Sequence, residues 1–354
     1  MPPSPVVEEY VASLTDGDPR FVREIHPADE MFSWNLQSLR GSREAAAVLY
    51  FSTGRQIADT VFAARRWRFA TRNAGTLLDF ASGFGRATRY LVREISPEAV
   101  WICDVDPNAV AFCEASFGVR GLVSTARAEA FAPGRRFDTI AASSFFSHMP
   151  ADRFEAWLAR LYALLAPGGL LLFSVHGQTL LSEPADWSTG IVFRGESETR
   201  RIAPQDYGTS WVLPEFVRGA AARASGGEGL LHFEPFGLCG HQDLYLLSSP
   251  PALPEAALVI PRVPRGELDA LEIHGRENLV AGGFVESDSE TDVLFLVRNE
   301  IRQIRPALGG GARRRWKFEI ASRDIGPDDL LRIEARTGAG VSRILAMGTL
   351  RPFL

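Results

Sequence analysis

The chain has 354 residues, of which 46% are hydrophobic, and its formal net charge is −5. This length favours two domains, and the small negative charge without a basic face argues against nucleic acid as a partner. Three irregularly spaced cysteines form no disulfide framework or zinc motif, and Lys317 is the only lysine, which disfavours Walker-type phosphate binding and Schiff-base catalysis.

The chain begins MPPSPVVEEY, which lacks the basic start and apolar core of a signal peptide. No apolar run approaches the ~20 residues that a membrane-spanning helix needs. We therefore expect a cytoplasmic protein without a transmembrane segment. The sequence leaves open whether the protein forms a homo-oligomer.

The predicted elements fall into three parts. Residues 1–75 read as an N-terminal helical cap, with the clearest helix over 44–68. Over residues 76–250 strands and helices alternate, which predicts a parallel sheet that binds ligands at the carboxyl ends of its strands. Within this part, residues 176–210 lose periodicity and are expected to run over the active-site face. Residues 251–354 contain short β-like runs between turn residues and predict a small all-β, sandwich-like domain.

The stretch LLDFASGFGRATRYL, residues 77–91, predicts a strand, a glycine turn and a helix. Gly83 and Gly85 let main-chain N–H groups approach a ligand closely. Asp79 adds a carboxylate that repels a pyrophosphate and suits an ammonium group. Thr88 stands where the dinucleotide fingerprint GxGxxG has its third glycine, which disfavours a nicotinamide dehydrogenase.

Further polar residues follow the next predicted strands. Asp104 ends the second strand, at a spacing that fits an acid binding ribose hydroxyls, although capping of the next helix is the alternative. Glu129 and Ala130 end the third strand, where an adenine edge would lie. Residues 143–148 follow the fourth strand and are expected to form the floor between cofactor and substrate.

Five segments in this order, LLDFASGFGR, CDVDPNAV, AEAF, SSFFSHMP and LLAPGGLLLFSVHG, resemble the motifs of class I S-adenosylmethionine-dependent methyltransferases over roughly residues 45–250. Ala81 departs from the first motif, which usually has glycine there. The resemblance implies an α/β, Rossmann-like, seven-stranded sheet with a reversed last hairpin. It also implies that S-adenosyl-L-methionine is bound by Asp79, Ala81, Gly83, Gly85, Asp104, Val105, Glu129, Ala130 and Ser143.

Three other segments, LYFSTGRQI, DYGTSWVLPEF and FGLCGHQDLYLL, resemble a bacterial methyltransferase subgroup associated with glycan and cell-surface polysaccharide biosynthesis. The segment SSFF replaces the N/D-P-P-Y of amino-methyltransferases, and neither a Pro-Cys nucleophile nor an aspartate cluster for magnesium is evident. A small-molecule or glycan acceptor, methylated on oxygen, is therefore expected. No metal is expected.

Histidines at predicted strand ends are candidates for acceptor chemistry. His148 is the nearest group with a useful pKa for a general base, and ordering of its own loop is the alternative role. His176, Tyr207, His241 and Asp243 are candidates for the acceptor pocket. A second hypothesis is a non-catalytic module that keeps the methyltransferase fold and uses the β-domain for assembly.

Overall fold

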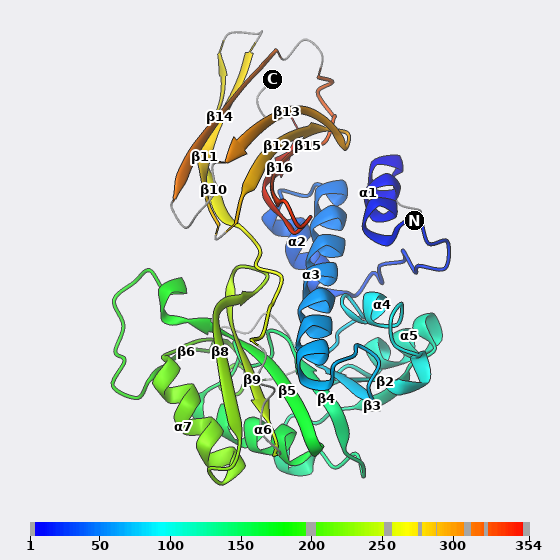
Figure 1. The fold of residues 1–354 in the computed structure, drawn as a ribbon, viewed down its shortest axis with the longest axis vertical. Coiled ribbons are helices and arrows are strands. Elements are labelled where there is room, and N and C mark those ends of the chain that lie inside the picture. The colour runs from blue at the N-terminus through cyan, green and yellow to red at the C-terminus, as the bar shows by residue number, and fades with distance from the viewer. Residues whose placement is uncertain are drawn as a thin grey trace. The chain divides into compact units, whose positions relative to one another are not determined.

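The computed structural model describes residues 4–195, 203–250, 257–274, 278–287, 289–307, 313–321 and 325–349. Its contacts divide the chain into two units. One unit is Gly54–Ile260, and the other combines Met1–Thr53 with Pro261–Leu354. The expected boundaries at residues 75 and 250 stay predictions, and the first 53 residues group by contact with the C-terminal strands. Helix α3 (Arg43–Phe69), expected over 44–68, contributes residues to both units (Figure 1).

The unit Gly54–Ile260 is built on one mixed sheet of nine strands. Strands β3-β2-β1-β4-β5 pair in parallel, β9 pairs antiparallel with β5, and β8 pairs with β9. This arrangement agrees with the expected Rossmann-like sheet and its reversed last hairpin. The expected count of seven strands is wrong, because β6 and β7 form within residues 176–212 and add to the end of β5. The strands are β1 (Leu77–Phe80), β2 (Val100–Asp104), β3 (Arg120–Val123), β4 (Phe137–Ala142), β5 (Leu165–Gly177), β6 (Ile191–Arg194), β7 (Thr209–Val212), β8 (Leu230–Leu238) and β9 (Gln242–Ser248).

Helices between these strands follow local signals in the sequence. Helix α5 (Pro107–Phe117) begins with the side chain of Asp106 accepting a hydrogen bond from Asn108 N and ends at Gly118 in the left-handed region. Helices α6 (Ala151–Ala163) and α7 (Pro214–Ser225) also occupy their expected positions. The expected helix after the glycine turn is much shorter, because α4 spans only Thr88–Leu91. A single helical turn offers little macrodipole to a ligand.

Arg65 connects α3 to the sheet of this unit. Its side chain is fully buried and donates to Thr139 Oγ1 at 2.6 Å, Arg72 O at 2.6 Å and Ala74 O at 2.5 Å. Burial lowers the pKa of Arg65 to about 10. The guanidinium therefore fixes the chain segment that enters β1, because each of these buried polar atoms needs its partner.

Two antiparallel sheets form the C-terminal part of the second unit. One has the order β10-β11-β14 and the other β13-β12-β15-β16, and side chains from both sheets share one hydrophobic core. The strands are β10 (Arg265–His274), β11 (Asn278–Glu286), β12 (Thr291–Val297), β13 (Glu300–Ala307), β14 (Arg314–Ala321), β15 (Leu331–Thr337) and β16 (Ser342–Gly348). Along β14 buried and exposed side chains alternate, and Lys317 is exposed. These strands agree with the expected all-β domain, apart from β13, which was not expected.

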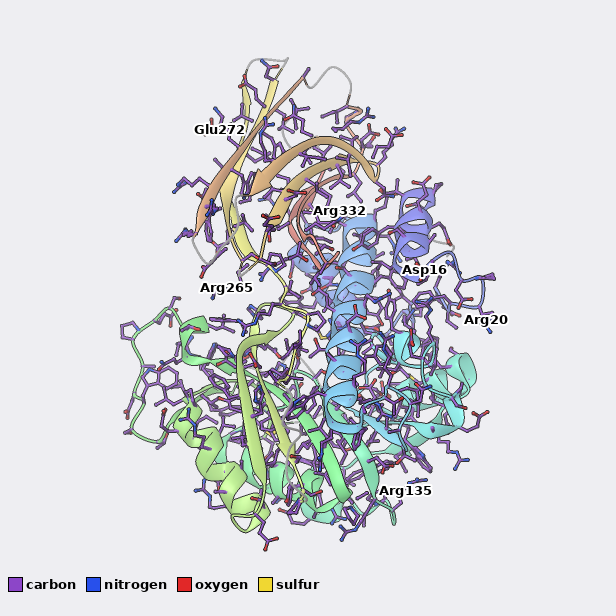
Figure 2. All side chains as sticks on the ribbon, viewed as in Figure 1. Asp16, Arg20, Arg135, Arg265, Glu272 and Arg332 are labelled. Atoms are coloured by element: carbon purple, nitrogen blue, oxygen red, sulfur yellow. The ribbon has the colours of Figure 1, made fainter. Side chains whose placement is uncertain are left out.

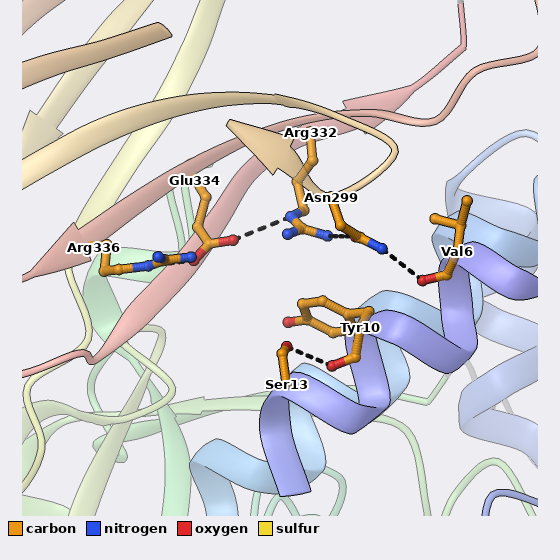
Figure 3. A network of polar contacts seen from close by, with 7 residues as sticks. All are labelled: Val6, Tyr10, Ser13, Asn299, Arg332, Glu334 and Arg336. Carbon is orange, nitrogen blue, oxygen red and sulfur yellow. Dashed lines mark hydrogen bonds and ion pairs between the residues drawn. The ribbon is translucent and has the colours of Figure 1, made fainter. Parts of the chain in front are cut away.

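Helices α1 (Pro5–Thr15) and α2 (Glu30–Ser38) belong to the same unit as these strands. Figure 3 shows the polar contacts between α1 and the strands: Asn299 Nδ2 donates to Val6 O at 2.8 Å, and Arg332 lies over the Tyr10 ring at 4.6 Å. Arg332 also pairs with the buried Glu334 at 3.1 Å. Burial raises the pKa of Tyr10 to about 12. Buried charges of this kind require their partners, so the network ties α1 to β15.

Apolar residues also line a cavity of about 400 Å³ in this unit, among them Leu268, Leu279, Phe295 and Ile333. Figure 2 shows charged side chains such as Arg20 and Glu272 at the margins of the ribbon, and both are exposed.

Within the described ranges, no helix combines the length and the apolarity that a membrane span requires.

Candidate functional site

The glycine turn leaves β1 through three residues in the left-handed region. Ala81, Gly83 and Gly85 have φ values of 58°, 53° and 76°. Ser82 N donates to Cys103 O at 3.1 Å, which holds the turn against the end of β2. An alanine in this region costs ~1–2 kcal/mol relative to an ordinary conformation, so Ala81 carries strain where glycine would not.

Asp104 at the end of β2 is bonded to the glycine turn. Its Oδ2 accepts from Gly83 N at 2.8 Å, and its Oδ1 accepts from Asp106 N at 2.9 Å. Burial raises the pKa of Asp104 against the opposing effect of these hydrogen bonds. Each carboxylate oxygen keeps a further lone pair for a ligand hydroxyl. The capping role belongs to the neighbouring Asp106.

Asp79 lies beside Asp104 and is 5% exposed. Burial raises its pKa to about 6, and the negative charge of Asp104 adds to this effect. Thr88 Oγ1 donates to Asp79 Oδ2 at 2.7 Å and opposes the rise. Two neighbouring carboxyl groups with raised pKa values form a site that favours a cation.

Thr88 was not predicted as a site residue, because the sequence drew attention only to the missing third glycine of the GxGxxG fingerprint at this position. Arg89 was missed as well. It is 1% exposed, its Nε donates to Gly85 O at 3.1 Å, and its guanidinium lies over the Phe117 ring at 5.5 Å. An arginine in a helical stretch carries no signal that it will turn inward beneath a glycine turn.

The other expected cofactor residues surround this turn less closely. Glu129 and Ala130 are exposed in a short helical turn after β3, and Glu129 helps to raise the pKa of Arg153. Val105 is half-buried directly after Asp104. Ser143 follows β4, and its buried Oγ has no hydrogen-bond partner within the described residues. The Val105 backbone contributes to the hydrogen bonding that lowers the pKa of Asp104, after the larger effects of Asp106 and Gly83. The roles of Glu129, Ala130, Val105 and Ser143 toward a cofactor stay predictions.

Histidines from three segments come together near the carboxyl ends of β4 and β5, and His176 belongs to β5 itself. The rings of His148 and His176 are 6.1 Å apart, and those of His176 and His241 are 5.9 Å apart. Tyr207 stacks on His148 at 5.0 Å with an interplanar angle of 14°. Of the expected acceptor residues, His148, His176, Tyr207 and His241 are therefore neighbours.

His148 is held by the segment that precedes β7. Its Nδ1 lies 2.9 Å from Gly208 O, and Gly208 N donates to His148 O at 2.7 Å. Because a carbonyl oxygen only accepts, Nδ1 carries the proton and Nε2 carries the lone pair. The arrangement orders the loop and also directs the basic nitrogen, so both expected roles are compatible.

His176 differs from an exposed histidine in its charge state. Its pKa is lowered to about 4, mainly by burial and to a smaller extent by the neighbouring His148 and His241. The ring is therefore neutral at physiological pH. Its Nε2 lies 3.2 Å from Gln242 Nε2, a contact that was not expected from the sequence.

Asp243 faces a different set of groups. Its Oδ1 accepts from Phe236 N at 2.9 Å across the β8–β9 hairpin, and burial raises its pKa. In the described ranges no hydrogen bond or ion pair joins Asp243 to the histidines, and its substrate role stays a prediction. No group of three or more His, Cys, Asp or Glu side chains suited to a metal occurs in the described part of the chain.

The two glycines of the turn differ in what surrounds them, which yields a prediction. A Cβ on Gly85 would run into the Phe117 ring, whereas a Cβ on Gly83 would meet nothing within 4 Å. We expect Gly85→Ala to lower the free energy of unfolding by about 3 kcal/mol or more, through steric overlap added to backbone strain. The matched variant Gly83→Ala should lose only about 1 kcal/mol, from strain alone. Urea-induced unfolding measures both, and equal losses would contradict the assigned packing.

The chain was compared with known proteins. A protein-family model described as "Methyltransferase domain" matches residues 78–171. A search of curated proteins found no significant match. Among solved structures, Streptomyces venezuelae DesVI is 15% identical with a TM-score of 0.43, covering 64% of this chain and 100% of that one.

Two other solved structures are similar to part of the chain. The DhpI complex with SAH is 18% identical with a TM-score of 0.41, covering 63% of this chain and 97% of that one. An O-methyltransferase family 2 protein from Planctomyces limnophilus, in complex with apigenin, is 17% identical with a TM-score of 0.40, covering 68% of each chain. By sequence, then, residues 78–171, which run from β1 into β5 and include the glycine turn, match a methyltransferase domain.

Proposed function

We propose that this protein is an S-adenosylmethionine-dependent methyltransferase that methylates an oxygen of a sugar, a glycan or a related small metabolite. The observation that carries the proposal is the bond between Asp104 and Gly83 N, which lies within the segment that matches a methyltransferase domain. This hydrogen bond places the Asp104 carboxylate next to Gly83, where no other atom lies within 4 Å of the position that a Cβ would take.

The residues present fit the cofactor by their chemistry. Asp104 offers one lone pair on each oxygen to the two ribose hydroxyls, and the Asp79 carboxylate, which is ionised above its pKa of about 6, pairs with the ammonium group of the methionine part. Glu129 and Ala130 are proposed to face the adenine. When bound, S-adenosyl-L-methionine supplies a methyl group on a positively charged sulfur.

In this proposal His148 accepts the proton of the acceptor hydroxyl at Nε2, while the hydrogen bond from Nδ1 to Gly208 O holds the ring. Tyr207, which stacks on His148, and His176 and His241, whose rings lie near one another, are proposed to contact the acceptor. Positioning contributes alongside proton transfer, because a nucleophile must approach the methyl group in line. The resemblance of the segments LYFSTGRQI, DYGTSWVLPEF and FGLCGHQDLYLL to a glycan-associated methyltransferase subgroup supports a sugar or glycan acceptor.

Calorimetry with S-adenosylhomocysteine tests the cofactor assignment. We expect the wild-type protein to bind it and Asp104→Asn to weaken binding at least about tenfold, because two charge-assisted hydrogen bonds are lost. Asp106→Asn is the matched control and should bind normally, since asparagine caps a helix as well as aspartate does. Unchanged affinity in Asp104→Asn would refute the ribose assignment. Absence of binding to the wild type, with NADH equally inert, would favour the non-catalytic module.

Asp79 predicts a pH dependence of cofactor binding. The carboxyl group is protonated below about pH 6 in the free protein, whereas the ammonium group of the ligand favours the ionised form. Binding therefore releases a proton below pH 6, and affinity should fall by up to about tenfold for each pH unit below it. Asp79→Asn should abolish this slope while keeping a partner for Thr88. Calorimetry from pH 5 to pH 8 measures both proteins, and an identical slope in the variant would exclude Asp79 as its source.

A methyl-transfer screen against nucleotide sugars and lipid-linked oligosaccharides tests the acceptor class. Once an acceptor is found, His148→Ala should lower kcat by about 10²- to 10⁴-fold if His148 is the base, with little change in cofactor affinity. His232→Ala, on β8, is the control histidine and should keep full activity. Unchanged turnover in His148→Ala would leave positioning as the source of catalysis.

A further inference from the structure

The contact between His176 and Gln242 belongs to a connected set of hydrogen bonds. Gln242, the first residue of β9, is 8% exposed. Its Oε1 accepts from Ser174 Oγ at 2.6 Å and from Ser144 Oγ at 3.1 Å, and its Nε2 lies 3.2 Å from His176 Nε2. We call Ser144, Ser174 and Gln242 the amide network.

The backbone of Ser144 determines which way the amide of Gln242 faces. Ser144 N donates to Ser174 Oγ at 2.8 Å, so the serine oxygen serves as an acceptor there. The hydroxyl hydrogen of Ser174 then needs its own acceptor, because the side chain is fully buried. Gln242 Oε1 is that acceptor. If the amide were reversed, its NH₂ group would face Ser174 Oγ and the hydroxyl hydrogen would lose its partner, which costs ~1–3 kcal/mol.

The amide orientation sets the tautomer of His176. An amide nitrogen donates and cannot accept, so the ring nitrogen that faces it must carry the lone pair. The proton then lies on Nδ1, which is buried and has no hydrogen-bond partner among the described residues. We propose that Gln242 is a positioning residue that holds His176 as the neutral tautomer protonated on Nδ1, and thereby removes His176 from the candidate bases. The assignment of a base rests on the proposed methyltransferase function, but the tautomer does not.

Other groups around His176 also favour the neutral form of its ring. His148 and His241 flank the ring, and a second positive charge between them would be unfavourable. Trp211 on β7 also packs near the ring, with centroids 6.2 Å apart. The Ser210 backbone opposes these effects by favouring the protonated ring, yet burial outweighs it and the pKa stays near 4.

A neutral His176 has consequences for the proposed reaction. The His148 ring, 6.1 Å away, becomes positive when it accepts a proton, and a charged neighbour would disfavour that step. The sulfonium of the cofactor is also positive and would be repelled by a charged His176. Burial thus keeps His176 uncharged, Gln242 sets which of its nitrogens carries the proton, and His148 can then serve as the base.

Nuclear magnetic resonance of protein labelled with ¹⁵N-histidine tests the tautomer without any assay of activity. His176→Asn assigns the ring signals. We expect wild-type His176 to show the pattern of a ring protonated on Nδ1 and to stay neutral from about pH 7 to pH 5, given its pKa near 4. A wild-type ring protonated on Nε2 would overturn the inference.

Gln242→Glu provides the second measurement. Its carboxylate still accepts from both serines, but a second acceptor oxygen now faces the ring. The proton of His176 should therefore move to Nε2, and its pKa should rise by at least about one unit. If the variant folds and the His176 spectrum does not change, the inference fails. Gln303→Glu, on the strand β13, is the matched control and should leave the His176 signals unchanged.

Activity separates this inference from the proposed function. Given an acceptor, Gln242→Glu should lower kcat and shift the acid limb of its pH profile, with a smaller effect on KM for the cofactor. A wild-type protein that shows the expected tautomer but methylates nothing would leave the inference standing and remove the function. Methylation by a wild-type protein whose His176 is protonated on Nε2 would support the proposed function and overturn the inference about the tautomer.

Discussion

The carboxylate of Asp104 is the point on which the glycine turn depends. It accepts backbone N–H groups from Gly83 and Asp106, and so joins the turn after β1 to the start of α5. Asp79 lies beside it, and burial together with the negative charge of Asp104 raises the pKa of Asp79. A protein tolerates two such groups at one turn where a positive ligand later compensates them. In the proposed function, the ammonium group of the ligand would provide this compensation.

The acceptor side of the site depends on residues that are distant in sequence. The segment before β7 supplies Gly208 and Tyr207, which hold and cover His148 sixty residues earlier. The strands β6 and β7 bring this segment back to the end of β5. The inserted strands thus enlarge the sheet and also bring the carbonyl of Gly208 to Nδ1 of His148.

Much of the sheet and the turn could be predicted from the sequence. The carboxyl ends of parallel strands meet at one edge, so Asp79, Gly83 and Asp104 could be placed together from their positions after strands. The strands β6, β7 and β13 were missed, because the first two lie in a segment with many Gly, Pro, Ser and charged residues and β13 is a polar edge strand with two exposed isoleucines. The amide network was also missed, since serine and glutamine give no signal until the fold aligns their hydrogen bonds. The shortness of α4 could not be foreseen from apolar periodicity alone.

The position of the single lysine has a practical consequence. Lys317 is exposed on β14, whereas the unit that contains the glycine turn and the histidines has no lysine at all. Reagents that acylate amines will therefore modify one side chain of known location, together with the chain terminus. A fluorophore or a surface tether can be attached to the β-domain in this way, with every side chain of the candidate site left chemically intact.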